Sequence, residues 1–368
     1  MSLASRSDMA YSAIGGLLRS QTSSLLRQSM NSFAQKRNWS TASIPNWKPT
    51  PSPELNVTLQ RFRETVFIPK SLGPDQQNLI YRLSNTRKLQ DNPITVYVGP
   101  DEEPYQLRTI PKNEYLSKAD AVKAFELMKQ TKDWSNFIPL LIGIQESGWR
   151  LNDDHFSSLV VGLAEANGLG YVSEALKQWR KTLFTMGHPD IGKRLFFELH
   201  VQAQQNGFQG PKFDQAYTLA QQFAQALEEP QNAPRKDKFV LKKQPSIIGV
   251  LLELSAVDAI NNGTTTGREV LAYGKRLRNA WNEASDLRRP KNWTLYDARL
   301  REYVPIYNGM KLALQVKQVA ENRRLASLFE EEIKRLHHYI GKAIELAKDR
   351  PAHPPLPGLL QAKLLHES

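Results

Sequence analysis

The segment from Arg268 to Arg301 carries the strongest chemical signal in the sequence, a surplus of positive charge beside aromatic side chains. It holds nine basic and four acidic residues, a net +5 over 34 positions. Positive side chains neutralise the phosphates of nucleic acids, and aromatic rings can stack on bases. We therefore identify candidate RNA-binding residues, which are Arg268, Lys275, Arg276, Arg278, Arg288, Arg289, Lys291, Trp293, Arg299 and Arg301. A basic surface that contacts only solvent is the competing interpretation.

The first half of this segment predicts an amphipathic helix. At 100° per residue, its apolar side chains share one face, which consists of Val270, Tyr273, Leu277, Trp281 and Ala284. Arg268 and Lys275 are expected on the opposite face, with Arg276 and Arg278 on the flanks. A basic loop that contains Trp293 is expected to follow the helix.

Other kinds of site find little support in the sequence. The chain has no cysteine, which excludes disulfides, thiolate metal sites and a cysteine nucleophile. His337 and His338 are adjacent, so on a helix their rings would point about 100° apart and could not easily share a metal ion. No glycine-rich segment is followed by the Lys-Ser/Thr pair of a phosphate loop. The sequence therefore predicts a non-enzymatic protein with no catalytic residues, metal site, cofactor or small-molecule substrate.

The middle of the chain has the periodicity of consecutive helices. Apolar spacing predicts helices over 118–131, 134–147, 154–167, 171–186, 190–206 and 212–227. Asn167-Gly168 recurs 39 residues later as Asn206-Gly207, so Gly168 and Gly207 are expected to end equivalent helices with positive φ. Helix pairs that recur at this interval predict a short α-solenoid of about three divergent repeats.

Part of this region resembles the pentatricopeptide repeat. Ser173-Glu174-Ala175-Leu176-Lys177-Gln178-Trp179, continuing to Met186-Gly187-His188-Pro189-Asp190, looks like the second helix of that repeat and its ending. Ile144 to Gly148, followed by Leu151 to Asp153, resembles the same junction one unit earlier. The resemblance covers about 110 residues, and the spacing of 39 is longer than the family's usual repeat. It implies paired helices that can bind RNA, but three units are too few for a base-by-base code. Helix pairs that only pack together are the alternative.

The whole chain is predicted to be mainly α-helical, with a second helical domain after the repeats. A compact β-branched run over 94–98, a turn and a return strand over 105–110 predict a small N-terminal β-hairpin. The predicted regions are a presequence over 1–39, an extended N-terminal region with the hairpin over 40–116, pentatricopeptide-like repeats over 117–228, a linker over 229–246, a C-terminal helical domain over 247–350 and a tail over 351–368.

The N-terminus has the composition of a mitochondrial import signal. Up to Pro45, serines are frequent and one acid, Asp8, accompanies five basic residues, namely Arg6, Arg19, Arg27, Lys36 and Arg37. Arg37-Asn38-Trp39-Ser40 resembles the site at which such signals are cut, so the mature chain is expected to begin at or near Ser40. The sequence therefore predicts a protein of the mitochondrial matrix.

Charge and hydropathy narrow the classes of partner. No run of 18 apolar residues is present, so no membrane span is expected. The net charge of +12 falls to about +8 without the presequence and suits an anionic partner. The chain resembles fungal mitochondrial ribosomal proteins, which implies mitochondrial rRNA and ribosomal proteins as partners. In this hypothesis the repeats dock on protein or rRNA, residues 268–301 meet rRNA phosphate, and an extended stretch over 40–60 crosses neighbouring subunits. A factor acting on mitochondrial transcripts and a scaffold for a respiratory complex remain the alternatives.

Overall fold

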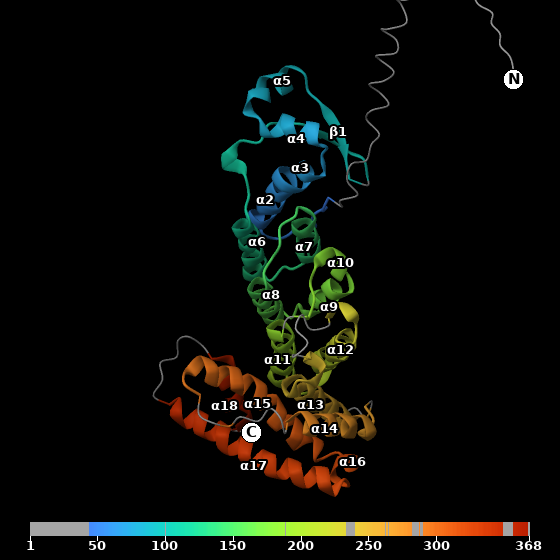
Figure 1. Cartoon of the computed structure of the whole chain (residues 1–368), viewed down its shortest axis with the longest axis vertical. Coiled ribbons are helices and arrows are strands. Elements are labelled where there is room, and N and C mark those ends of the chain that lie inside the picture. The colour runs from blue at the N-terminus through green and yellow to red at the C-terminus, as the bar shows by residue number, and fades with distance from the viewer. Residues whose placement is uncertain are drawn as a thin grey trace, which may run out of the picture. The chain divides into compact units, whose positions relative to one another are not determined.

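The computed structural model describes residues 44–99, 101–187, 189–232, 240–261, 263, 265–281, 287, 290–348 and 356–366. Within these residues the fold is mainly helical and includes a two-stranded sheet, as the sequence predicted (Figure 1). The predicted presequence, together with Arg288 and Arg289, lies outside the described residues. The described residues divide between two compact units, of which one covers Ser71–Thr109 and the other combines Ile44–Lys70 with the chain from Ile110 onward.

The first unit combines short helices with the predicted hairpin. Its elements are α4 (Pro74–Tyr81), the 3-10 turn η3 (Leu83–Asn85), α5 (Thr86–Asp91), β1 (Thr95–Val98) and β2 (Glu103–Gln106). The strands pair antiparallel, with Thr95 opposite Gln106 and Val98 opposite Glu103. Alternate side chains of β1 are buried, as expected for a strand with one covered face. The hairpin prediction is confirmed, although the second strand begins and ends earlier than 105–110.

The prediction of an extended 40–60 stretch is wrong from Pro53 onward. Pro53–Phe62 forms α2, because proline is well suited to the first helical position and the Ser52 side chain accepts a hydrogen bond from Leu55 N at 3.2 Å. Leu55, Leu59 and Phe62 then lie on one face and are buried in the chain's own core. α2 continues into the π-turn η2 (Arg63–Phe67) and α3 (Ile68–Ser71). Residues 44–52 have no regular structure.

The segment before α2 is also bound to its own chain. The Asn136 side chain accepts a hydrogen bond from Lys48 N and donates one to Lys48 O, both at 2.8 Å. Ile44 is buried, and Trp47 packs against the core. This segment therefore packs against other elements of the second unit, to which it belongs.

Paired helices follow the 3-10 turn η4 (Lys112–Glu114) in the second unit. They are α6 (Lys118–Thr131), α7 (Phe137–Glu146), α8 (Asp153–Glu165), α9 (Leu169–Lys177), α10 (Trp179–Thr182), α11 (Pro189–Gln205) and α12 (Gly210–Ala226). α8 contacts both α6 and α11, while α9 contacts both α7 and α12. The helices predicted from periodicity are present, except that the one expected over 171–186 is divided into α9 and α10 and ends at Thr182. Leu183, with φ +53°, follows it in the left-handed conformation.

The expectation of positive φ at Gly168 is wrong. Gly168 has φ −98°, and Asn167 before it has φ +55°. Gly207 does have positive φ, at +61°. At each helix end, the residue after the one with positive φ donates a backbone hydrogen bond to the last turn. Gly168 N donates to Leu163 O at 2.6 Å, and Phe208 N donates to Ala203 O at 2.8 Å. The equivalent residues are therefore Asn167 and Gly207, 40 positions apart, because asparagine also tolerates the left-handed conformation.

The C-terminal helices surround a second hydrophobic core. They are α13 (Pro245–Asn261), α14 (Gly267–Trp281), α15 (Trp293–Ala313), α16 (Lys317–Ala320), α17 (Arg323–Leu346) and α18 (Pro357–His366). The predicted linker contains the 3-10 turns η5 (Pro230–Asn232) and η6 (Leu241–Lys243). α13 belongs to both cores, since Val250 and Leu254 pack in the first and Ile248 and Leu252 in the second.

The region predicted as a tail without regular structure of its own contains a helix over 357–366. α18 packs against α15 and α17, and its Leu359 and Ala362 side chains are buried. The Asp297 carboxylate on α15 accepts hydrogen bonds from Gly358 N at 2.8 Å and Leu359 N at 3.2 Å. These are N–H groups of the first turn, which have no partner inside their own helix. A side chain distant in sequence therefore caps α18, and local sequence reasoning could not find it.

Asn167→Val and Gly207→Val are each expected to lower the free energy of unfolding by about 1–2 kcal/mol, because valine is strained at positive φ. Gly170→Ala is the control, since an added Cβ there would contact nothing within 4 Å. That control is expected to gain up to about 1 kcal/mol. Urea denaturation followed by circular dichroism measures all three. A neutral Asn167→Val would contradict the equivalence of the two helix ends.

Candidate nucleic-acid interface

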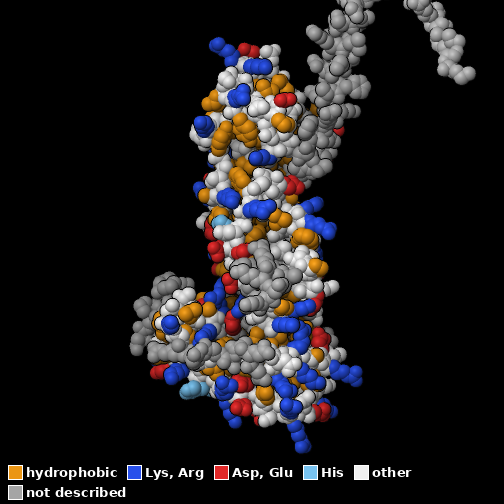
Figure 2. All heavy atoms as spheres, viewed as in Figure 1, with side chains coloured by type: hydrophobic (Ala, Val, Ile, Leu, Met, Phe, Trp, Pro, Cys, Tyr) orange, Lys and Arg blue, Asp and Glu red, His pale blue; other side chains and the backbone are white. Residues whose placement is uncertain are grey.

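α14 has the two faces that the sequence predicted. Val270, Leu277 and Trp281 are buried in the second core, and Trp281 Nε1 donates a hydrogen bond to Glu332 Oε2 at 3.0 Å. Arg268 and Lys275 are exposed on the opposite face. In Figure 2, Lys and Arg side chains are frequent where Figure 1 places α14, with acidic side chains between them. The helix therefore presents a basic face to its surroundings.

One edge of this face includes residues that the sequence analysis missed. Arg276 is exposed, lies over the Tyr273 ring at 5.6 Å and donates a hydrogen bond from Nη2 to Lys242 O at 3.1 Å. That bond brings η6 beside α14, and the neighbouring Lys243 is exposed. Lys242 itself forms an ion pair with Glu228. The lysine pair was visible in the sequence, but its segment was interpreted as a linker.

We call Arg268, Lys275, Arg276 and Lys243 the α14 basic surface. Its side chains are long, exposed and cationic, which suits contact with phosphate. Arg278 is half-buried on the other flank of the helix, so it is less available. Ala284, which was predicted to extend the apolar face, lies outside the described residues.

The loop before α15 contributes a weaker part of the predicted site. Lys291 is exposed, whereas Pro290 beside it is buried. Trp293 is half-buried and packs against the second core, with its ring stacked on that of Tyr296 at a centroid distance of 5.4 Å. One face of the Trp293 ring is therefore engaged within the chain.

Arg299 and Arg301 are engaged inside the fold. Arg301 forms an ion pair with Asp297, from Nε to Oδ2 at 3.1 Å. Burial, the larger effect, raises the pKa of Tyr339 to about 12, and the nearby positive charge of Arg299 lowers it. Both arginines are only partly accessible. The structure therefore divides the eight predicted residues that it describes between exposed positions and internal contacts.

The described residues offer little support for a metal site or a membrane span. They contain no group of three or more His, Asp or Glu side chains that could hold a metal ion. His337 lies over the ring of His366, at 4.6 Å between centroids, and its Nδ1 is 3.2 Å from Tyr307 Oη. In the part of the chain that the structure covers, no helix is both long and apolar enough to cross a bilayer.

Comparison with known proteins gives a family. The family model described as mitochondrial ribosomal protein mS27 matches residues 31–361. The chain is also similar to the small ribosomal subunit protein mS27 of Neurospora crassa, with 22% identity over 268 residues. The similar region covers 71% of this chain and 65% of the length of that protein.

Arg299→Gln is expected to raise the pKa of Tyr339 further, because it removes a cation that lowers that pKa. The pKa of about 12 exceeds the value near 10 of an unfolded tyrosine, so the stability that Tyr339 contributes below pH 10 is lost as pH rises toward 12. Ultraviolet titration of phenolate, with Tyr339→Phe subtracted, measures the shift. Lys275→Gln on the exposed face is the control. An unchanged titration in Arg299→Gln would return Arg299 to the RNA-binding candidates.

Proposed function

This chain belongs to the mitochondrial ribosomal protein mS27 family, and we propose that it is a structural component of the small subunit of the mitochondrial ribosome. The observation that carries the proposal is the family match, which extends over both the helix pairs and the C-terminal helices. In this role the protein acts in the mitochondrial matrix and binds rRNA and neighbouring ribosomal proteins. It contributes binding surfaces and no catalytic chemistry.

The α14 basic surface is the proposed contact with rRNA. Arg268 and Lys275 point away from the second core, so they can meet phosphates without disturbing packing. The bond from Arg276 to Lys242 O keeps its guanidinium beside the Tyr273 ring. Contacts of this kind depend on backbone charge and do not require a particular base sequence.

The helix pairs are the proposed docking surface for neighbouring proteins. We propose that they are divergent pentatricopeptide-like units stacked as a short solenoid. The contacts of α8 with α6 and α11, and of α9 with α7 and α12, support this stacking because each helix of a pair meets its counterparts in adjacent pairs. The small number of units favours a binding surface over sequence-specific reading of RNA.

Sedimentation tests the ribosomal assignment. The protein is expected to migrate with the small ribosomal subunit in a sucrose gradient of mitochondrial lysate, to remain there in high salt and to leave that fraction after ribonuclease treatment. Cross-linking to transcripts without co-migration would instead support an RNA-processing factor. Migration unaffected by ribonuclease, away from both subunits, would support the scaffold alternative.

Salt dependence tests the α14 basic surface. Changing Arg268, Lys275 and Arg276 together to Gln should reduce the slope of log affinity for RNA against log salt by about two to three units, because each phosphate contact releases counterions. The control changes Lys334 and Lys342 of α17, together with Lys348 just after that helix, to Gln, which removes equal charge from another exposed surface. Filter binding over a salt series gives both slopes. Equal slopes for the two variants would show that only total charge matters.

A further inference from the structure

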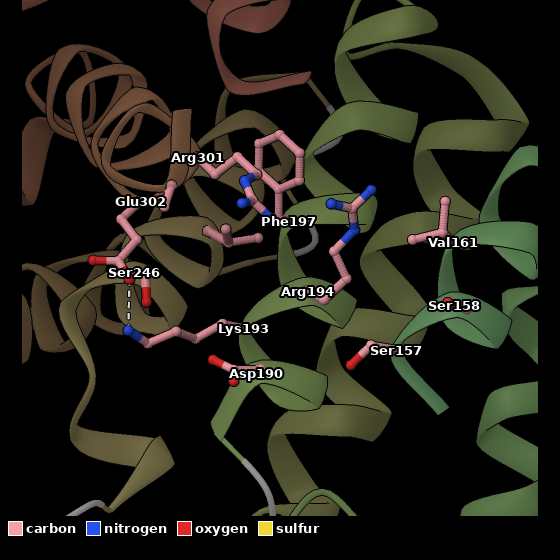
Figure 3. A pocket seen from close by; sticks show the side chains of 12 residues that line it. Ser157, Ser158, Val161, Asp190, Lys193, Arg194, Phe197, Ser246, Arg301 and Glu302 are labelled. Atoms are coloured by element: carbon pink, nitrogen blue, oxygen red, sulfur yellow. Dashed lines mark hydrogen bonds and ion pairs between the residues drawn. The ribbon is translucent and has the colours of Figure 1, made fainter. Parts of the chain in front are cut away.

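A pocket of about 350 Å³ lies between the helix pairs and the C-terminal helices of the second unit. Side chains from α8, α11, α13 and α15 line it, among them Ser157, Lys193, Arg194, Ser246, Arg301 and Glu302. In Figure 3, Arg194 and Arg301 extend toward the same space, with the Phe197 ring between them in this view. The volume is near the lower end of the range for small-molecule sites.

Three side-chain atoms around this pocket have no hydrogen-bond partner among the described residues. Arg194 Nε and Ser246 Oγ are both buried without a hydrogen-bond partner, and Ser246 is only 8% exposed. Arg301 Nε is near Asp297 Oδ2, but the contact lacks hydrogen-bond geometry. A guanidinium can only donate, so the missing partners must be acceptors. Several unsatisfied donors around one cavity indicate a ligand rich in acceptor oxygens.

The carboxylates around the pocket hold its cations in place. Glu198 pairs with Arg194 at 2.7 Å, and Glu302 with Lys193 at 2.5 Å. Burial raises the pKa of Glu198, and the adjacent Arg194 opposes that rise. Three cations line the cavity, together with the carboxylates of Asp190 and Glu302. Because Glu198 and Asp297 pair with Arg194 and Arg301 from outside the lining, each cation of the pocket has a carboxylate partner that fixes its position.

Two helix N-termini add partial positive charge at the pocket. Asp190 and Lys193 lie in the first turns of α11, and Ser246 is the second residue of α13. Free backbone N–H groups at a helix N-terminus carry partial positive charge and favour anions. Both 17-residue helices thus begin beside the cavity.

We propose that this pocket binds a phosphate group carried by a nucleotide. Arg194 and Arg301 donate to the phosphate oxygens from two sides, Ser246 Oγ donates from α13, and the remaining volume holds part of the nucleoside. The source of the nucleotide rests on the proposed function, because a ribosomal protein would receive it from rRNA. Phosphate recognition itself does not depend on that source.

Calorimetry and thermal unfolding of the full chain test the site with adenosine monophosphate, inorganic phosphate and acetate. The monophosphate and phosphate are expected to bind and raise the Tm, whereas acetate should not. Arg301→Gln should weaken binding of the monophosphate about ten- to a hundredfold, as for loss of a charged hydrogen bond. Ser246→Ala should weaken it about two- to tenfold, as for a neutral one.

Ser246→Ala also separates binding from folding. Its hydroxyl has no hydrogen-bond partner among the described residues, so the Tm without ligand should stay unchanged or rise. The double variant Arg194→Gln with Glu198→Gln removes both charges of a buried pair, avoids an unpaired carboxylate and should also abolish phosphate binding. Equal binding of acetate would overturn the proposal and point to a protein carboxylate. So would phosphate binding that both single variants leave intact.

The source of the phosphate is tested separately. A short single-stranded RNA that competes with adenosine monophosphate in the wild type, and not in Arg301→Gln, would identify a phosphate within RNA. If RNA did not compete with adenosine monophosphate in the wild type, the pocket would be a site for free mononucleotides. If the protein failed to migrate with ribosomes but still bound the monophosphate, the ribosomal function would fail and the pocket would stand.

Discussion

Glu253 has no exposure to solvent, so its carboxylate depends entirely on partners within the protein. Oε2 is 2.7 Å from His200 Nδ1 on α11, and Oε1 accepts a hydrogen bond from Asn308 Nδ2 on α15 at 2.6 Å. These contacts join three helices at one side chain. Nearby, a Cβ on Gly309 would lie 2.8 Å from Gly249 O, so α13 and α15 cross with their backbones nearly in contact. The α11–α13–α15 arrangement permits little sliding, and it positions both arginines of the pocket.

Sequence periodicity predicted elements that have one buried face. Helix α6 was predicted with the bounds that the structure shows, and the exposed positions of Arg268 and Lys275 on α14 followed from the helical repeat. Helix α13 gives no such contrast, because apolar side chains cover both of its faces and both are buried. Its role in joining two cores depends on tertiary packing and could not be predicted from spacing.

The candidate site shows the same division between local and distant causes. Charge and spacing predicted a basic helix face, but they could not show that Arg276 would reach Lys242 O, 34 positions away. They also could not separate Arg301 from the surface residues, since its place depends on Asp297 and on the packing of α11. At helix ends, Asn167 was overlooked because glycine is the stronger signal for positive φ.

The cap that Asp297 provides for α18 has a consequence for the order in which the chain folds. A ten-residue helix is too short to be stable in isolation, so α18 must form as it docks. Its docking site on α15 lies some 60 residues earlier in the chain, and a polypeptide synthesised or imported from its N-terminus exposes that site first. Until α18 arrives, Asp297 has only Arg301 as a described partner for its charge. Completion of the C-terminal helices therefore waits until α18 has been delivered, because only then are the capping groups of Asp297 and the first turn of α18 brought together.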